Sequence, residues 1–338
     1  MGDPMSDTDF FRADVPGSMR AVAIDSFGGD EQLHLVAVQV PKAEANQVLL
    51  RVHTAGIGHW DAFEREGLFA EMSDVPAAFP YRLGSEGSGT VVAIGEKVTQ
   101  RKLGDQVYGI VGLRTPKDGF HADYVAVDED KVWPVPRWLT MAEAGAFASN
   151  GGTALRGLRD VLRVAAGETL LVYGASGGMG HLAIQLARSF NVRVIAVASG
   201  PDGATLAQTL GADIAIDGKA ADVLAQLQAA APERIDAALV TGGGDQANSV
   251  LKWLKPGGRI AVPNGVFPTP EAPPNTVLTS YNADYDNHLM NALNHVSDAV
   301  GLKVHVGRML TLEEAQLGHR LLDQHILGRI AFAVSDAE

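Results

Sequence analysis

The chain of 338 residues contains no cysteine. This absence excludes disulfide bonds, a thiolate nucleophile and any zinc site with cysteine ligands. It also gives no support to secretion, because small secreted proteins commonly depend on disulfides.

Positive charge and long apolar runs are also scarce. The chain has 27 Lys and Arg against 40 Asp and Glu, a net charge of -13, so neither nucleic acid nor an anionic membrane is expected as a partner. Apolar stretches such as 192–198 are far too short to span a bilayer. Residues 1–18 are acidic and lack the apolar core of a signal peptide, so we expect a disordered tail and a cytoplasmic protein.

Residues 169–188, TLLVYGASGGMGHLAIQLAR, carry the strongest signal. A continuous apolar run over 170–173 predicts a parallel strand buried on both faces. Apolar residues from Met179 to Ala187 then recur at helical spacing. Between the two, Ala175, Gly177 and Gly180 fill the three slots of the G-x-G-x-x-G motif. This context indicates a dinucleotide site, in which backbone N–H groups and the helix end hold the phosphates.

The same loop admits a second interpretation. Gly174, Ser176 and Gly178 spell G-x-S-x-G, the nucleophile elbow of a serine hydrolase. Histidines and acids downstream could complete a triad, but a hydrolase does not need Gly180. A hydrolase that uses Ser176 therefore remains a weaker alternative.

The two halves of the chain differ in pattern. Residues 19–136 contain closely spaced strand candidates at 47–55, 89–94, 106–110 and 120–127, which favour a compact barrel. The first of these alternates, so we expect two unlike faces. From about residue 138, apolar strands at 192–198, 214–216, 235–240 and 259–262 alternate with helical segments at 204–210 and 220–230, which indicates an α/β parallel sheet.

Two further segments bear on the organisation. Residues 141–148 are helical in pattern, and Gly151 with Gly152 is expected to interrupt them before a helical pattern resumes at 155–164. Near the end, Thr311 and Glu314 resemble a capping box that opens a helix ending around Gln324, followed by a strand over 329–334. This last stretch is expected to return to the first domain.

The order of motifs resembles the medium-chain dehydrogenase/reductases, in their zinc-independent quinone oxidoreductase and enoyl reductase branch. The stretches that carry the resemblance are AGIGHWDAFEREG (55–67), FPYRLGSEGSGTVVAIGEKV (79–98), GDQVYG (104–109), the central stretch from 167 to 188, LGAD (210–213) and AQLGHRLLDQHILGRIAF (315–332). The resemblance implies a GroES-like β-barrel catalytic domain and an inserted Rossmann domain with a doubly wound parallel sheet. The expected boundaries are 19–139, 140–302 and 303–338.

The resemblance and the strand ends together predict a cofactor cleft between the two domains. Candidate cofactor-binding residues are Thr153, Ala175, Ser176, Gly177, Gly178, Met179, Gly180, Ser199, Gly200, Thr241, Gly242, Asn264 and Gly265. Candidate pocket residues, without an assigned catalytic role, are Gly58, His59, Trp60, Asp61 and Phe63. His59 is a candidate for a phosphate contact, whereas Asp61 is expected to orient its own loop. A homodimer or homotetramer is also implied, with residues 276–282 as the edge strand that pairs across the interface.

Departures from the family narrow the reaction. The zinc enzymes have cysteine at the position of Gly58 and histidine at that of Ser85, and their hydroxyl relay matches Trp60, so no metal site is expected. Residues 198–200 follow the second Rossmann strand without a carboxylate, which favours NADPH, although Asp202 could serve NAD instead. The expected activity is hydride transfer from NADPH to a quinone or an α,β-unsaturated carbonyl. A redox-inactive NADP-binding protein on the same fold is the alternative.

Overall fold

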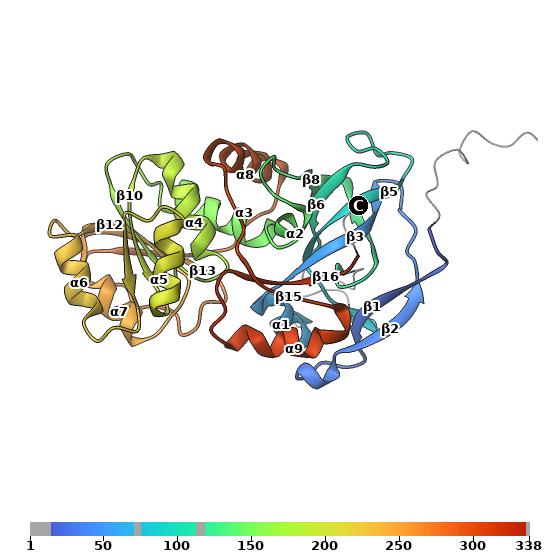
Figure 1. The fold of residues 1–338 in the computed structure, drawn as a ribbon, viewed down its shortest axis with the longest axis horizontal. Helices are drawn as coiled ribbons and strands as arrows, with labels where there is room; N and C mark the ends of the chain where they lie inside the picture. Colours follow the sequence, from blue (N-terminus) through green and yellow to red (C-terminus); the bar gives the residue numbers. More distant parts are fainter. Residues whose placement is uncertain (1–14, 71–75, 113–118, 336–338) are drawn as a thin grey trace, which may run out of the picture.

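The computed structural model describes residues 15–70, 76–112 and 119–335 (Figure 1). A mostly antiparallel part occupies one end of the molecule and a parallel sheet covered by helices occupies the other. Within the described ranges, none of the helices combines the length and the apolarity that crossing a membrane would require.

The first part contains two sheets. A three-stranded sheet has the order β2-β1-β4, and a larger one has the order β15-β16-β3-β5-β6-β8, with β7 also paired to β3. Their bounds are β1 Ser18–Ile24, β2 His34–Gln39, β3 Gln47–Ile57, β4 Tyr81–Arg82, β5 Glu86–Ile94, β6 Gln106–Ile110, β7 Tyr124–Asp128, β8 Val132–Pro134, β15 Val306–Leu310 and β16 Arg329–Ala333. Helices α1 (His59–Arg65) and α9 (Ala315–Arg320) lie beside this sheet (Figure 1). The GroES-like expectation is confirmed.

Strand β3 runs from Gln47 to Ile57, two residues beyond the predicted end. It is the central strand of the barrel, because it pairs with β5, β7 and β16. Leu49 and His53, on the second of its two faces, are both buried, and the His53 ring Nε2 hydrogen-bonds the Thr90 hydroxyl at 2.9 Å. The alternation therefore marks two buried faces, one of which is partly polar. At the other end, β1 begins at Ser18, inside the expected tail, because Ser18 pairs with Gln39.

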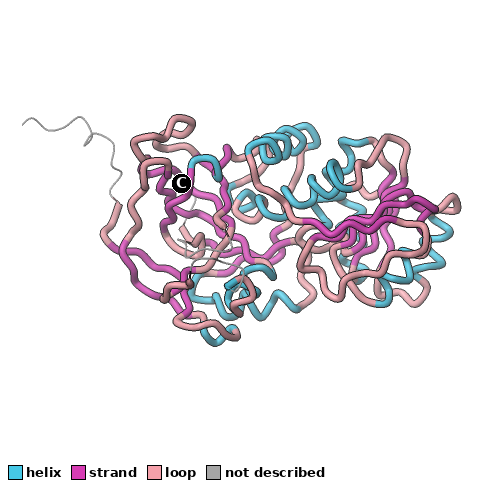
Figure 2. The backbone as a smooth tube through the Cα atoms, turned by 180° about the vertical axis from the view of Figure 1, so that it is seen from behind, coloured by secondary structure: helices cyan, strands magenta, loops and turns pink. Residues whose placement is uncertain are grey.

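The second part is a six-stranded sheet of parallel strands in the order β11-β10-β9-β12-β13-β14. Helices cover both faces, as Figure 2 shows from behind. The strands are β9 Thr169–Tyr173, β10 Arg193–Ala198, β11 Ile214–Asp217, β12 Ile235–Val240, β13 Leu254–Pro263 and β14 Val277–Tyr281. The helices of this part are α3 Ala148–Arg156, α4 Gly180–Ala187, α5 Gly200–Thr209, α6 Val223–Ala230, α7 Asp245–Leu251 and α8 Asn287–Val300. The short helix α2 (Met141–Ala144) contacts β3, β5 and β6 of the first part instead. This arrangement confirms the Rossmann prediction.

The continuous apolar run of β9 explains why the sheet is covered on both sides. Leu170 and Val172 face one core, which α3, α4 and α8 complete. Leu171 faces the opposite core, to which α6 and α7 contribute. Because the order of the strands reverses between β9 and β12, the loops after these two strands diverge and open a crevice.

Helix α3 corrects the expectation that glycines interrupt it. The helix runs through Gly151 and Gly152. A Cβ at Gly151 would lie 2.8 Å from the Phe147 ring, and one at Gly152 would lie 3.1 Å from the Tyr285 ring. The glycines are therefore explained by close packing of aromatic rings against the helix, which outweighs their low helix propensity.

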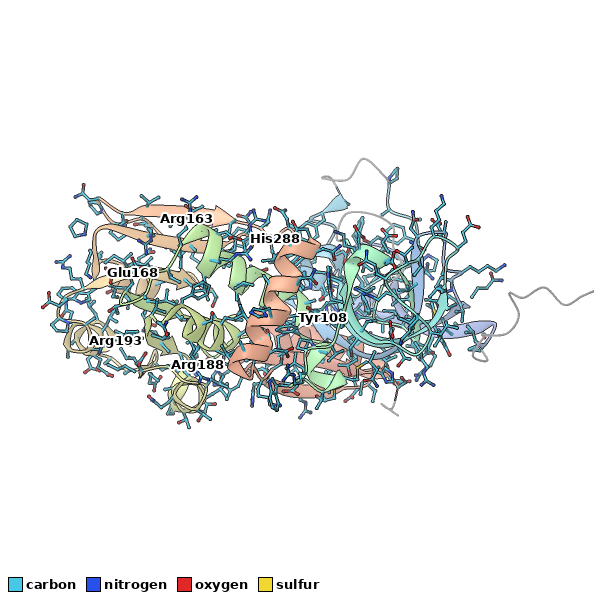
Figure 3. All side chains as sticks on the ribbon, turned by 90° about the horizontal axis from the view of Figure 1, so that it is seen from above. Tyr108, Arg163, Glu168, Arg188, Arg193 and His288 are labelled. Carbon is cyan, nitrogen blue, oxygen red and sulfur yellow. The ribbon has the colours of Figure 1, made fainter. Side chains whose placement is uncertain are left out.

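The chain enters and leaves the second part at neighbouring points. The Lys303 ammonium donates to the Trp138 carbonyl at 2.6 Å, and the Val304 amide donates to the Glu143 carboxylate at 3.2 Å. Helix α8 lies beside this crossing, and the fully buried Tyr108 donates to Asn294 of that helix (Figure 3). The two histidines of α8, His288 and His295, are exposed.

Candidate active site

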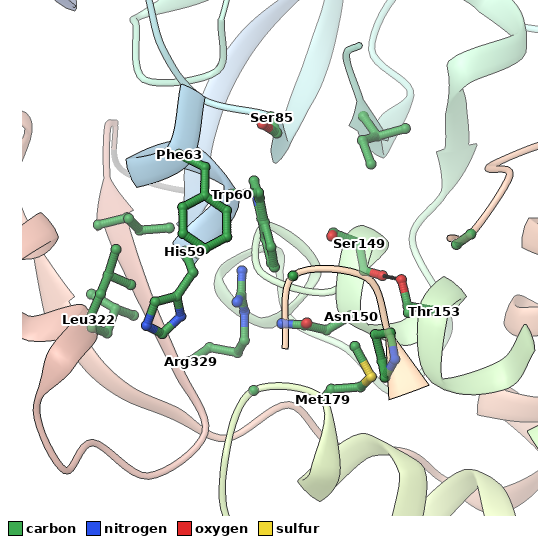
Figure 4. A pocket seen from close by; sticks show the side chains of 18 of the residues that line it. His59, Trp60, Phe63, Ser85, Ser149, Asn150, Thr153, Met179, Leu322 and Arg329 are labelled. Carbon is green, nitrogen blue, oxygen red and sulfur yellow. Dashed lines mark hydrogen bonds between the residues drawn. The ribbon is translucent and has the colours of Figure 1, made fainter. Parts of the chain in front are cut away.

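A cleft of about 2200 Å³ is lined by residues of both parts. It is larger than a typical single-ligand pocket, and its size suits a dinucleotide together with a second substrate. Figure 4 shows its centre, where α1 meets α3 and the loop after β9.

The glycine-rich loop joins β9 to α4 and lines the cleft with Ser176, Gly177, Gly178 and Met179. A Cβ at Gly180 would lie only 2.2 Å from the Gly174 carbonyl, so this glycine lets the helix pack closely onto the strand. A Cβ at Gly177 would meet nothing closer than 3.4 Å, which leaves its backbone open to a ligand. Ala175 and Gly180 shape the loop but do not line the cleft.

A buried histidine anchors this loop. His181 Nδ1 donates to the Gly177 carbonyl at 2.9 Å, and Nε2 accepts from the His305 amide at 3.1 Å. These two bonds fix the neutral tautomer, because one ring nitrogen donates and the other accepts. Burial is the main reason that the pKa of His181 falls to about 4, so the ring is neutral at physiological pH.

Ser176 also holds the glycine-rich loop in place through two hydrogen bonds. Its hydroxyl accepts from the Ser199 amide at 3.3 Å, and its carbonyl accepts from the Gly328 amide at 2.7 Å. No hydrogen bond between described residues joins this hydroxyl to a histidine. The arrangement therefore does not support the serine hydrolase alternative.

The residues that follow the parallel strands lie at the cleft. Ser199, Thr241, Gly242, Asn264 and Gly265 all line the cleft. The Thr241 hydroxyl donates to the Tyr173 carbonyl at 3.0 Å, which ties the end of β12 to the end of β9. Thr153 of α3 lines the cleft as well, whereas Gly200 is buried at the start of α5 and does not.

The wall opposite the glycine loop comes from α1, with Gly58, His59, Trp60 and Phe63 in the cleft. The Trp60 ring folds back over Gly58, so that a Cβ at position 58 would lie 2.5 Å from it. His59 is exposed, with Nε2 3.7 Å from the Asp323 carboxylate. Phe63 packs edge-on against Phe267, at 6.3 Å between ring centroids.

Asp61 is fully buried beneath this wall and does not line the cleft. Its carboxylate accepts from the Gly58 amide at 2.8 Å and from the Ser85 hydroxyl at 3.1 Å. It therefore fixes the turn into α1.

A buried ion pair, not anticipated from the sequence, lies beside the cleft, and its arginine, Arg329, lines the cleft. The Arg329 guanidinium pairs with Glu86, and the two side chains are 4% and 1% exposed. Arg329 also lies 5.1 Å from the centroid of the Trp60 ring and donates to the Ala146 carbonyl at 3.0 Å. With its amide oxygen turned toward Arg329, Asn150 accepts from Nη1 at 2.6 Å. Arg329 thus links β16, β5, α1 and α3.

Sequence reasoning also missed a second interaction, near the end of β10. The Asp202 carboxylate accepts from His325 Nε2 at 2.9 Å and from the Gly203 amide at 2.9 Å. The hydrogen bond from His325 is the main reason that the pKa of Asp202 is lowered. Lys219, which follows β11, lines the same cleft. These residues are far apart in the sequence, so no motif connects them.

The side chains at positions 58 and 85, where the zinc enzymes have metal ligands, do not form a metal site. Gly58 has no ligand atom, and the Ser85 hydroxyl is bonded to Asp61. Across residues 15–70, 76–112 and 119–335, no cluster of three or more His, Cys, Asp or Glu side chains is arranged to hold a metal.

Comparisons with known proteins agree with this geometry. Residues 44–137 match the alcohol dehydrogenase GroES-like domain, and residues 178–300 match the zinc-binding dehydrogenase domain. The chain is 30% identical to the quinone oxidoreductase of Mus musculus over 248 residues, 72% of each chain. It belongs to the medium-chain dehydrogenase/reductase family. Within the medium-chain dehydrogenase/reductases it is quinone oxidoreductase-like, and it is an NAD(P)H-dependent oxidoreductase.

Two further relatives extend this assignment. The 2-methylene-furan-3-one reductase of Solanum lycopersicum is 33% identical over 262 residues, 76% of this chain and 65% of that one. The structure of the quinone oxidoreductase from Coxiella burnetii superimposes with a TM-score of 0.79 at 27% identity, over 94% of this chain and 100% of that chain. The medium-chain dehydrogenase/reductase fold thus extends over nearly the whole molecule.

Proposed function

We propose that this protein is a metal-independent, NADPH-dependent reductase that transfers hydride to a conjugated acceptor, a quinone or an α,β-unsaturated carbonyl compound. The observation that carries the proposal is the wall at Gly58, Trp60 and Ser85, which offers neither a metal-ligand set nor a free hydroxyl relay. Reduction of a plain carbonyl concentrates charge on one oxygen, whereas a conjugated acceptor delocalises it and makes a smaller demand. Two relatives are named for conjugated acceptors.

The residues present fit a dinucleotide. Open space at Gly177, and at Gly242, where a Cβ would meet only a Tyr173 ring carbon at 3.8 Å, lets ligand atoms approach the backbone. Residues 176–179 at the start of α4 would hold the phosphates, and Thr241, Gly242, Asn264 and Gly265 would line the nicotinamide half. When bound, the reduced nicotinamide supplies the hydride. Trp60 and Phe63 would orient the acceptor and exclude water.

Preference for NADPH rests on the end of β10. Ser199 stands where a carboxylate would bind the ribose of NADH. Asp202, the nearby acid, is already bonded to His325 and to the Gly203 amide. Lys219 lines the same cleft and is a candidate partner for a 2′-phosphate. The preference is expected to be modest, because Asp202 lies close to this subsite.

One experiment tests the acceptor class, the cofactor preference and the metal independence together. Steady-state rates are compared for 1,4-quinones and enones against simple ketones and primary alcohols, with NADPH and NADH, before and after dialysis against a chelator. C4-deuterated NADPH reports whether the label moves directly into the product. We expect faster reduction of conjugated acceptors, tighter binding of NADPH and no effect of the chelator.

Each measurement has an outcome that would contradict one component of the proposal. Equal or faster turnover of unconjugated substrates would remove the acceptor class, and tighter NADH binding would reverse the cofactor choice. Loss of activity on chelation that zinc restores would remove metal independence. Binding of NADPH without turnover of any acceptor would favour a redox-inactive protein instead.

A further inference from the structure

Three hydroxyl groups meet on the wall of the cleft beside Asn150. They belong to Ser149 and Thr153 of α3 and to Tyr285, which precedes α8, and all three residues line the cleft. The Thr153 and Tyr285 oxygens are 3.1 Å apart, and the Ser149 and Tyr285 oxygens are 3.4 Å apart. Ser149 and Thr153 are only 6% and 7% exposed, so bulk water reaches them little. Figure 4 shows the first two next to Asn150 and above Met179.

The direction of these hydrogen bonds leaves one donor for a ligand. The Thr153 hydroxyl donates to the Ser149 carbonyl at 2.8 Å, so its oxygen is an acceptor for the Tyr285 hydroxyl. Among the described residues, the Ser149 hydroxyl then has only the Tyr285 oxygen as an acceptor, at 3.4 Å, which is long for an O–H···O bond. Turning this proton toward a ligand in the cleft therefore costs little.

Packing fixes the cluster before any ligand arrives. The Tyr285 ring lies on Gly152, where even a methyl group would approach it to 3.1 Å. The Lys131 ammonium donates to the Tyr285 carbonyl at 3.1 Å, and the Ser149 amide donates to the buried Glu86 at 2.8 Å. Burial raises the pKa of the Tyr285 phenol, so it retains its proton at neutral pH.

We propose that Ser149 and Tyr285 form a proton relay to the carbonyl oxygen of the acceptor, which makes them catalytic residues of the reduction and makes enones the favoured substrates. This inference rests on the proposed function. Hydride adds to the β-carbon of the enone, the C=C electron pair shifts, and the carbonyl oxygen becomes an enolate oxygen. The Ser149 O–H bond breaks as an O–H bond to this oxygen forms. The Tyr285 hydroxyl then turns from the Thr153 oxygen to the Ser149 oxygen and gives it a proton, and a solvent water molecule reprotonates the phenolate, leaving hydroxide to the bulk solvent. The resulting enol converts to the ketone after release.

The relay matters more for one acceptor class than for the other. An enolate is a strong base that needs a proton before the product leaves. The hydroquinone anion formed from a quinone is about as weak a base as a phenolate. Removing the relay should therefore slow enone reduction much more than quinone reduction.

The test uses Tyr285→Phe and Ser149→Ala in the full-length protein, with Tyr108→Phe as the control. Tyr108 also loses a hydroxyl and one hydrogen bond, to Asn294, but lies outside the cleft. For both relay variants we expect kcat on an enone to fall by at least about ten-fold, the lower side of general-acid effects. We expect quinone turnover to change less than about three-fold, NADPH affinity to stay unchanged and the solvent isotope effect on the enone to rise. An equal loss on both acceptors, or no loss, overturns the relay.

A second readout does not need turnover. 4-Nitrophenolate carries its charge on an oxygen that mimics the enolate, and its absorption band reports its protonation. We expect the wild-type protein to bind it and both relay variants to bind it at least about ten-fold more weakly. Unchanged binding in the variants overturns the relay. If the wild-type protein reduces no acceptor, the proposed function fails, and this titration still decides whether the hydroxyl cluster stabilises an oxyanion.

Discussion

Trp60 occupies the space that a side chain at position 58 would need. The Trp60 ring lies 2.5 Å from the place of a Cβ at Gly58 and stacks on the buried Arg329. The glycine and the tryptophan are therefore one structural unit. A substitution at position 58 therefore cannot add a side chain there unless the Trp60 ring moves.

Substitution of Gly58 tests this unit. We expect Gly58→Asn to lower the free energy of unfolding by about 1–3 kcal/mol, the usual cost of overpacking, and to reduce turnover. The double variant Gly58→Asn/Trp60→Ala should recover part of the lost stability, because the ring is gone. Chemical denaturation measures both, with Gly17→Asn as a control at a glycine whose Cβ would meet nothing within 4 Å. A Gly58→Asn protein as stable as the wild type would contradict the clash.

Single residues differ in how far the sequence reveals them. The glycine loop and the strand ends could be located because each follows a strand directly and its spacing has a chemical reason. Arg329 could not, because its partners Glu86, Trp60 and Asn150 come from three distant segments. Tyr285 was missed for the same reason, since only the packing of its ring on Gly152 brings its hydroxyl to α3.

At the scale of elements, the start of α4 depends on a histidine that must stay neutral. Because the pKa of His181 is about 4 in the folded protein against 6.5 for a free side chain, the unfolded chain binds one more proton between these values. Stability is therefore fully present above pH 6.5 and declines as the pH falls toward 4. This single group should account for about 3 kcal/mol of that loss.

His181→Gln checks this directly. The variant should be less stable at pH 7, because the bonds to Gly177 and His305 are weakened. The free energy of unfolding of the variant should also depend less on pH between pH 6.5 and pH 4. The slope of this free energy against pH should be smaller by the equivalent of about one bound proton. Urea unfolding at several pH values gives the slope, and His295→Gln on the exposed side of α8 is the control. An unchanged slope in His181→Gln would mean that the buried ring is not the titrating group.

Helices and strands could be predicted from the sequence where the pattern of apolar residues was clear. The alternation of apolar runs and helical segments identified β9 to β13, because a doubly covered parallel sheet leaves no polar face. Helix α3 was misread, because low glycine propensity is a local signal, whereas the Tyr285 ring that packs on Gly152 is distant in the sequence. That both faces of β3 are buried could not be predicted, because burial depends on strands that pair with it from elsewhere.

At the scale of the whole molecule, β14 is an edge strand with an exposed apolar residue. Val277 is 59% exposed, and in the described part of the chain β14 pairs only with β13. Unprotected edges tend to pair with another chain. We therefore propose that β14 joins two copies of this protein into a dimer.

Sedimentation velocity tests the dimer. We expect the wild-type protein to sediment as a dimer at micromolar concentration and Val277→Asp to shift it toward the monomer, because the charge would be buried without a partner. Leu35→Asp is the control, since Leu35 is also exposed and lies on β2, at the edge of a different sheet. A wild-type monomer, or an unaffected Val277→Asp dimer, would place the interface elsewhere.

The hydrogen bonds that join the crossing points at Trp138 and Glu143 to Lys303 and Val304 also bear on how such a molecule could arise. The intervening segment leaves and rejoins the barrel part at adjacent positions, so its removal would leave two ends that a short linker can bridge. A gene segment encoding such a unit can be exchanged between proteins in one event without disturbing the strands on either side. The segment carries the glycine-rich loop together with Ser149 and Tyr285, so such an exchange would transfer the cofactor site and the proposed relay as one unit.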